Sequence, residues 1–438
     1  MSYKQLKKNT LCIYIAQLKK SDYTIVRTYR DDTMISECYI FDALRTPRGR
    51  GKSNGSLHPL TSVELLSQCL AQLRKRSLSD PSQLKCISDV MIGCVSAVGE
   101  QGANIGRSAC MSAGYPYSIP TIHVNRFCAS SLSAINLAAA QINAQSGRAI
   151  IAGGVEMMSK LPIGSDGGAL MVDPEIVYKH AIVPLGISAD LIATREKYHR
   201  HDLDKFSLNS HKKAALAQAE GYFNRSIIPI LDINQQIILE HDEQVRQDAS
   251  LEQMSKLQPS FAMMGHMGGF DQLVCQKFSN IAELMHTHTP ANSSGIVDGA
   301  AVVLLGNGSL KATGLKPRAR ILTYYDVGVD PTDALSGPAL AAQKALKSIG
   351  MNASDIDLWE INEAFASVAM YAIDQLNIDP AQVNVNGGSI ALGHPLGATG
   401  AILMNTLVDE LERQNLSTGC VSMCIGSGMA TATIIERV

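Results

Sequence analysis

Short apolar runs alternate with stretches of helical periodicity from residue 37 to the C-terminus. Four early runs have the length and composition of buried strands: 38–43, 87–93, 120–125 and 149–152. Thr61 and Glu64 have the spacing of a capping box, and leucines recur behind them at helical period. Alternating strands and helices predict an α/β protein with a largely parallel sheet covered by helices.

The C-terminal third repeats this order. Residues 356–361 are a predicted strand, 362–365 open a helix, and 383–388 lead into a second helix rich in glycine and alanine. Residues 421–424 form a further strand that ends at a glycine-rich turn. Segment 87–90 aligns with 356–359 and 151–157 aligns with 424–429, so we expect two similar α/β halves.

Residues 161–285 differ from both halves, because they combine polar helices with long loops that carry many lysines and arginines. Such a segment could cover a phosphorylated ligand or could be a solvated helical insertion, and both interpretations stay open here. Residues 1–34 have scattered basic residues and no strong periodicity. We interpret them as a poorly ordered extension, with a weak transit segment as the alternative and Met34 as a candidate initiator.

Composition narrows the class of protein. Of the 438 residues, 46% are hydrophobic and 18% charged, which is typical of a globular chain and not of a disordered or fibrous one. A net charge of −2 gives no reason to expect nucleic acid or an anionic membrane as a partner. No apolar run approaches the ~20 residues that span a bilayer. The ten cysteines are dispersed without a Cys-x-x-Cys pair, which favours a reduced, cytoplasmic protein.

Cys128 is the first candidate for chemistry. It lies between a predicted strand and a helix rich in alanine and serine. A helix N-terminus directs N–H groups and partial positive charge at such a sulfur, so we expect a lowered thiol pKa and a nucleophilic thiolate. The alternative is a structural cysteine in the core.

Three further motifs contain polar groups beside flexible backbone. His394 is surrounded by glycines, with Pro395 suited to the first turn of a helix, and it is a candidate general base rather than a core histidine. Asn362 alone is best read as a helix cap, although it could donate a hydrogen bond beside the histidine. Cys424 ends a strand next to Gly426, where a second base and an oxyanion hole could form.

These four motifs together resemble the thiolase family. The matching segments are 124–130, 362–365, 393–395 and 424–428, supported by 45–47, 157–159 and 292–300, so the resemblance covers residues 37–438. It implies a thiolase fold, with five αβαβα layers built from two similar halves and an inserted loop domain that covers coenzyme A. The implied domains are the extension 1–34, an N-terminal half of 35–160 plus 286–312, a loop domain of 161–285 and a C-terminal half of 313–438.

The resemblance also implies an activity, that of an acyl-CoA:acetyl-CoA C-acyltransferase. Cys128 would attack an acyl-CoA carbonyl and His394 would accept its proton, while Cys424 would move a proton at the α-carbon of acetyl-CoA. One oxyanion would be stabilised by His394 with a water on Asn362, and the other by the backbone N–H groups of Cys128 and Gly426. The reaction would be thiolytic cleavage of 3-oxoacyl-CoA or its reverse, a Claisen condensation.

For the substrate, Ser294 aligns with a serine that contacts pantetheine, and Arg246 with an arginine near the CoA nucleotide. Coenzyme A and acetyl-CoA are expected as substrates, with no permanently bound cofactor, and the chain is expected to form a homodimer or homotetramer. The sequence departs from the family pattern at Pro290, Asp248, Ser427 and Ala430. These departures bear on CoA geometry and substrate choice and remove no catalytic group.

Several alternatives remain. A biosynthetic acetoacetyl-CoA thiolase fits the same motifs, whereas a ketoacyl-synthase-like condensing enzyme would carry histidine in place of Cys424. A non-catalytic acyl-CoA carrier would be expected to lack the nucleophile or the histidine. No metal site is expected, because the two histidines in 285–288, taken to lie on one face of a strand, have no nearby cysteine or carboxylate in the sequence.

Overall fold

A computed structural model describes residues 36–438 of the chain. The proposed extension, 1–34, lies outside the described residues. Residues 37–438 form one compact unit.

The N-terminal half contains a ladder of five main strands. They are β1 (Tyr39–Arg45), β3 (Ile87–Gly93), β4 (Thr121–Val124), β5 (Ala149–Met157) and β8 (Val297–Gly306), in the spatial order β4-β3-β5-β8-β1. The short β2 (Gly49–Arg50) also pairs with β8. Strand β3 is parallel to β4 and β5, whereas β8 is antiparallel to β5 and β1.

The C-terminal half repeats this arrangement. Its strands are β9 (Ala319–Gly328), β10 (Leu358–Ile361), β11 (Thr418–Ile425) and β12 (Met429–Arg437), in the order β10-β11-β12-β9. A parallel bridge between Trp359 and Val383 stands where β4 pairs with β3 in the first half. The two halves are therefore similar in strand order, and two residue pairs between β1 and β9 connect their ladders.

The expectation of a largely parallel sheet is wrong. Among the strands of residues 36–438, only β3, β4 and β5 in one half and β10 and β11 in the other pair in parallel, apart from isolated bridges. Strands β11 and β12 are joined by residues 426–428 alone, and so short a connection permits only an antiparallel pair.

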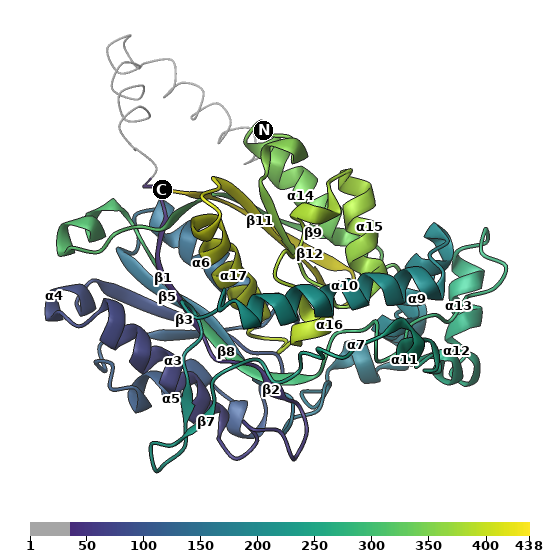
Figure 1. The fold of residues 1–438 in the computed structure, drawn as a ribbon, viewed down its shortest axis with the longest axis horizontal. Coiled ribbons are helices and arrows are strands. Elements are labelled where there is room, and N and C mark those ends of the chain that lie inside the picture. Colours follow the sequence, from purple (N-terminus) through teal and green to yellow (C-terminus); the bar gives the residue numbers. More distant parts are fainter. Residues whose placement is uncertain (1–35) are drawn as a thin grey trace, which may run out of the picture. The chain divides into compact units, whose positions relative to one another are not determined.

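Helices form the other three layers (Figure 1). Helices α6 (Ser130–Asn143) and α17 (Thr399–Arg413) lie between the two ladders, α3 (Ser62–Ser77) and α5 (Ile105–Ser112) cover one outer face, and α14 (Gly337–Ser348) and α15 (Ala366–Leu376) cover the other. Along β8, Val303 and Leu305 face the central helices, while Val302 and Leu304 face α3. Both faces of this strand are thus buried, which explains its continuous apolar sequence.

Helix α3 has both the N-terminal cap and the buried apolar face that the sequence predicts. The Thr61 hydroxyl accepts a hydrogen bond from the Glu64 N–H at 3.1 Å, and the Glu64 carboxylate accepts one from the Thr61 N–H at 2.7 Å. Leu65, Leu66 and Leu73 are fully buried on the same helix. The predicted capping box and amphipathic helix are confirmed.

Helices are the main regular elements of segment 161–285. Its helices are α7 (Ala169–Val172), α8 (Pro174–Lys179), α9 (Leu185–Glu196), α10 (Arg200–Ala219), α11 (Leu251–Ser255), α12 (Ala262–Met267) and α13 (Phe270–Lys277), with a hairpin of β6 (Ile230–Leu231) and β7 (Ile237–Leu239). Helix α9 packs on α15, and α10 packs on α15 and on α16 (Ser389–Leu392). The remaining elements are α4 (Pro81–Leu84) and the 3₁₀ turns Gly99–Gln101, Gly308–Thr313, Ala353–Asp355 and Pro380–Gln382. Within 36–438, no helix is long and apolar enough to cross a membrane.

Candidate active site

Cys128 lies in a tight turn between β4 and α6. Phe127, the residue before it, has φ 44°, a left-handed conformation that is uncommon for a bulky side chain. Asn125 Oδ1 accepts a hydrogen bond from the Phe127 N–H at 2.9 Å, and the Ser130 hydroxyl donates to the Phe127 carbonyl at 2.6 Å. Ser130 Oγ also accepts from the Arg126 N–H at 3.0 Å. These bonds hold the strained turn and fix the position of the Cys128 thiol.

The thiol itself is buried, with 8% of Cys128 exposed. The backbone N–H groups of Gly426 and Cys128 donate to its sulfur, but burial outweighs them and raises the pKa of Cys128 to about 11. The expectation of a lowered thiol pKa is therefore wrong, because burial of the sulfur outweighs the backbone N–H groups that donate to it. The raised pKa favours the neutral thiol of Cys128 in the free protein.

Cys424 lies close to Cys128, although the two are far apart in the sequence. It stands near the end of β11, 1% exposed, before the three-residue turn to β12. Burial raises the pKa of Cys424 far above its usual range, and the proximity of Cys128 raises it further. In the turn, Ser427 has φ 62°, so a side chain occupies the left-handed region that glycine normally fills.

His394 follows α16 and is 4% exposed. Its Nδ1 lies 2.6 Å from the Thr399 hydroxyl, which donates its own proton to the Pro395 carbonyl at 2.9 Å. The hydroxyl has one proton, so His394 Nδ1 carries the N–H and Nε2 has the free lone pair. Pro395 is not in the first turn of a helix as predicted, because α17 begins only at Thr399. It belongs to the turn that connects α16 and α17.

Asn362 faces this lone pair. Its Nδ2 lies 3.4 Å from His394 Nε2, and its Oδ1 accepts a hydrogen bond from the Ser389 hydroxyl at 2.6 Å. The serine therefore determines which end of the amide points to the imidazole. Helix α15 begins at Ala366 with Phe365 at its N-cap, so the interpretation of Asn362 as a helix cap is wrong.

The imidazole is held in its neutral form. Burial lowers the pKa of His394 to about 3, and the Arg48 guanidinium adds to the effect. Arg48 is 3% exposed, and its Nε and Nη1 have no hydrogen-bond partner in the described part of the chain. The Glu360 carboxyl is also buried, and burial together with the nearby Glu363 raises its pKa well above its ordinary value. A neutral His394 with a free Nε2 has the protonation state of a general base.

Ser294 lies between the two segments that carry Asn362 and His394. Its N–H donates to the Ala364 carbonyl at 2.9 Å. The neighbouring Gly295 donates to the Ser389 carbonyl at 3.2 Å and accepts from the His394 N–H at 2.9 Å. The 292–295 loop is thereby fixed against the segments that carry Asn362 and His394.

Arg246 is exposed on the loop after β7. Its backbone N–H donates to His211 Nδ1 on α10 at 3.3 Å. Two residues earlier, the Gln244 side chain packs against Gly295, where an added Cβ would lie 3.1 Å from Gln244 Cγ. The Arg246 loop therefore runs beside the loop that carries Ser294.

Some positioning residues were not predicted from the sequence. The buried Glu156 carboxylate accepts hydrogen bonds from the Val95, Ser96 and Gly397 N–H groups at 2.9, 3.0 and 2.9 Å, which ties the His394 loop to the N-terminal half. Thr399 and Ser389, described above, were also missed. Their only sequence signal is proximity to the Gly-His-Pro motif, which does not reveal what a side chain contacts.

The argument against a metal site also needs correction. Residues 285–288 belong to no strand, and carboxylates do lie beside them. His286 is within hydrogen-bond distance of both Asp190, at 2.8 Å, and Asp271, at 3.1 Å. Asp190 is 96 residues from His286, and Asp271 is 15 residues away on helix α13, so only the tertiary fold brings these carboxylates to the histidine.

Comparison with known proteins identifies the family. Residues 38–269 match the family model "Thiolase, N-terminal domain", and residues 315–437 match "Thiolase, C-terminal domain". A 3-ketoacyl-CoA thiolase of Saccharophagus degradans is 36% identical over 91% of this chain and 98% of its own length. An acetyl-CoA acetyltransferase of Cupriavidus necator is 36% identical over 92% of this chain and 100% of its own. Among solved structures, the dimeric peroxisomal thiolase of Saccharomyces cerevisiae has a TM-score of 0.81 at 33% identity, covering 93% of this chain and 100% of that one.

The fold and the matched family models define an acyltransferase, and members of this family use CoA substrates. The chain belongs to the thiolase family. The five-layer αβαβα fold expected from the motifs is confirmed by these matches and by the layers described above.

Proposed function

We propose that the chain catalyses CoA-dependent cleavage of 3-oxoacyl-CoA through an acyl-enzyme at Cys128. The proposal depends on one observation above all: the Gly426 N–H points at the Cys128 sulfur beside Cys424. A nucleophile, a second thiol and an oxyanion donor thus meet at one point, on segments from both halves of the chain.

In the first half-reaction, Cys128 Sγ attacks the 3-oxo carbonyl while its proton passes to His394 Nε2. The bond between carbons 2 and 3 then breaks, which leaves the acyl group on Cys128 as a thioester. The departing acetyl-CoA enolate takes a proton from Cys424. In the second half-reaction the thiol of CoA gives its proton to Cys424 and attacks the thioester. Acyl-CoA leaves, and His394 returns the proton to Cys128.

Two oxyanions form along this route. The N–H groups of Cys128 and Gly426, which both donate to the Cys128 sulfur, would stabilise the oxyanion derived from the acyl carbonyl. His394, with a water held on Asn362, would stabilise the enolate oxygen of acetyl-CoA. Because both pKa shifts favour a neutral thiol and a neutral imidazole, we infer that the proton moves during attack rather than beforehand.

For the CoA substrate, we propose that Ser294 contacts the pantetheine arm and that Arg246 binds a phosphate of the nucleotide. Ser294 lies beside the catalytic motifs, and Arg246 is exposed on the adjoining loop. The two catalytic halves would then be 35–160 with 286–312 and 313–438, and the CoA-covering segment would be 161–285.

We also infer a cytoplasmic homodimer or homotetramer. The nine cysteines in the described part of the chain are all free, as is typical of a reducing compartment. Light scattering of the purified protein tests the assembly.

A panel of substrates tests the activity. Purified protein is mixed with CoA and 3-oxoacyl-CoA of increasing length, from acetoacetyl-CoA to long-chain and ring-derived thioesters, and the enolate absorbance is followed. Faster loss on longer substrates supports a degradative role, whereas activity confined to acetoacetyl-CoA supports the biosynthetic alternative. Absence of activity at every length contradicts the proposal.

A further inference from the structure

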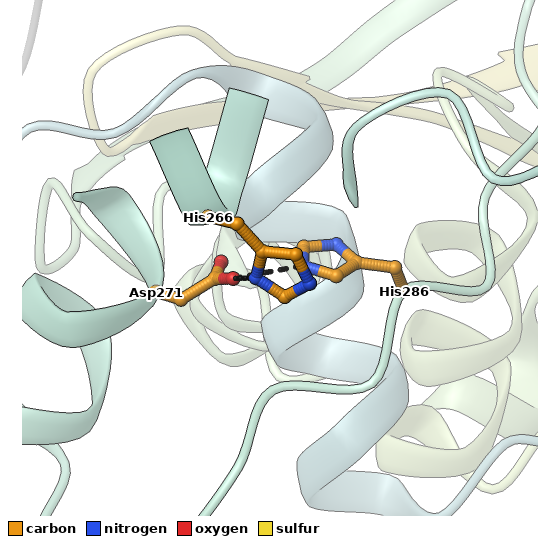
Figure 2. Close-up of side chains that lie close together, drawn as sticks. All are labelled: His266, Asp271 and His286. Atoms are coloured by element: carbon orange, nitrogen blue, oxygen red, sulfur yellow. Dashed lines mark hydrogen bonds and ion pairs between the residues drawn. The ribbon is translucent and has the colours of Figure 1, made fainter. Parts of the chain in front are cut away.

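A cluster of two histidines and one carboxylate lies outside the catalytic centre. His266 comes from α12, Asp271 from the first turn of α13, and His286 from the segment that leads to β8. Figure 2 shows both imidazoles directed at the Asp271 carboxylate. His266 Nδ1 lies 2.5 Å and His286 Nε2 lies 3.1 Å from Asp271 Oδ2, and all candidate ligand atoms are within 4.8 Å of one another.

The orientation of His286 is fixed from behind by Asp190 on α9. This carboxylate is fully buried and accepts from His286 Nδ1 at 2.8 Å, from His288 Nδ1 at 2.7 Å and from the Thr287 N–H at 3.0 Å. With Nδ1 bound to Asp190, only Nε2 of His286 faces the cluster. Metal-bound histidines are held in the same way by a carboxylate behind the ring.

Asp271 has an unused ligand atom. Its Oδ2 contacts both histidines, but Oδ1 is buried and has no hydrogen-bond partner among residues 36–438. Gly265 lets this atom approach, because a Cβ there would lie 2.2 Å from Asp271 Oδ1 and 2.8 Å from His286 Cε1. A buried carboxylate oxygen without a partner is costly unless a cation or a donor satisfies it.

From this geometry we propose that His266 Nδ1, Asp271 and His286 Nε2 bind one divalent transition-metal ion of the Zn²⁺ class. Two imidazoles and one carboxylate are a suitable donor set for zinc, and a water completes four-coordination. In a tetrahedral site with bonds near 2.0–2.1 Å the ligand atoms are about 3.3 Å apart. The 3.1 Å distance between His286 Nε2 and Asp271 Oδ2 already matches this spacing. The 2.5 Å distance between His266 Nδ1 and Asp271 Oδ2 is shorter, and rotation of the exposed His266 side chain can lengthen it.

The ion would add a common link between three segments that already meet at the Asp271 carboxylate. Helices α12 and α13 would be fixed to residue 286, eight positions before Ser294 along the chain. Its role is therefore to brace the end of segment 161–285 where it returns to β8. The site is independent of the proposed chemistry at Cys128.

Metal binding to the full-length protein tests this proposal. Protein stripped with a chelator and dialysed is titrated with ZnCl₂ by calorimetry, and Co²⁺ is used as a spectroscopic probe of coordination. We expect one ion per chain, a tetrahedral Co²⁺ spectrum and a higher Tm with Zn²⁺. Zn²⁺ binding should weaken by at least 10-fold when a ligand is removed, as in His266→Gln or Asp271→Asn. Asp190→Asn should have an effect of the same size, because it removes only the group that orients His286.

His201→Gln is the matched control, since His201 is exposed on α10 and outside the cluster. It should bind Zn²⁺ as the wild type does. His266→Gln removes an exposed side chain, so circular dichroism should show an unchanged fold. The proposal is overturned if the wild type binds no Zn²⁺, if His266→Gln binds equally well, or if His201→Gln is impaired to the same extent. Preference for Mg²⁺ or Ca²⁺ over Zn²⁺ would also overturn it.

Discussion

The side-chain amide of Asn362 lies 3.4 Å from His394 Nε2, and its orientation is set by the Ser389 hydroxyl 2.6 Å from Oδ1. The same imidazole is fixed on its other side by Thr399. Neither supporting residue belongs to a recognisable motif. The geometry of the proposed base is thus determined by two hydroxyl groups that can be removed singly.

Removal of the Ser389 hydroxyl should disorder the Asn362 amide. In Ser389→Ala, Oδ1 loses its donor, the amide can rotate, and we expect kcat for thiolysis to fall by about 10-fold, less than the loss of a whole oxyanion donor. Ser389→Thr restores the hydroxyl and should recover most of kcat. Steady-state kinetics measure kcat, and denaturation measures the unfolding free energy of both variants. A packing defect would lower the unfolding free energy of both alike, whereas loss of the amide orientation lowers kcat in Ser389→Ala alone.

Thr399 should control the tautomer of His394. Thr399→Val leaves the buried Nδ1–H without an acceptor, which costs about 1–3 kcal/mol of stability and favours the wrong tautomer. We expect kcat to decrease by about 10²-fold, while Thr399→Ser stays close to the wild type. Kinetics and urea denaturation of both variants provide the measurement. Equal activity of the valine and serine variants would refute the assignment.

The two cysteines should differ in acyl-enzyme formation. Cys128→Ser removes the proposed nucleophile, so no labelled acyl group should attach when the protein is mixed with radiolabelled acyl-CoA and quenched. Cys424→Ser keeps the nucleophile and should be labelled, although turnover should be lost. Intact-protein mass spectrometry detects the adduct. If neither variant is labelled, or both are, the two roles assigned here are wrong.

The sequence predicted the parts of the site that are local and failed where tertiary contacts decide. Cys128 was placed correctly between strand and helix because that transition is encoded within a few residues. Its pKa was predicted in the wrong direction, since burial by the other half of the fold outweighs the local N–H groups. Asn362 was favoured as a helix cap because the distant His394 and Ser389 cannot be seen from residues 362–365. The carboxylates beside His286 were missed for the same reason, as they come from α9 and α13.

A buried ion pair should hold the Arg246 loop to the N-terminal half. Asp242 accepts two hydrogen bonds from Arg45, each 2.8 Å, and both side chains are fully buried. Asp242→Ala leaves Arg45 as an unpaired buried charge, so the unfolding free energy should fall by about 3–5 kcal/mol. The exposed pair of Lys256 and Glu252 is the control, because Glu252→Ala should change stability by no more than about 0.5 kcal/mol. Urea denaturation at neutral pH compares the two; similar losses would contradict the prediction.

His211 should make the fold sensitive to acid. It is 4% exposed and accepts the Arg246 N–H at Nδ1, and burial, with a smaller effect from Arg246, lowers its pKa to about 4. The unfolded chain binds this proton near pH 6.5 and the folded chain does not, so the stability that neutral His211 contributes is complete above pH 6.5 and is lost as the pH falls toward 4. Relative to His211→Gln, the wild type should therefore lose about 1.4 kcal/mol of unfolding free energy per pH unit across that window. The comparison cancels other titrating groups such as His394. Parallel denaturation curves from pH 7 to 4.5 with a constant difference between the two proteins would show that His211 is not held neutral by the fold.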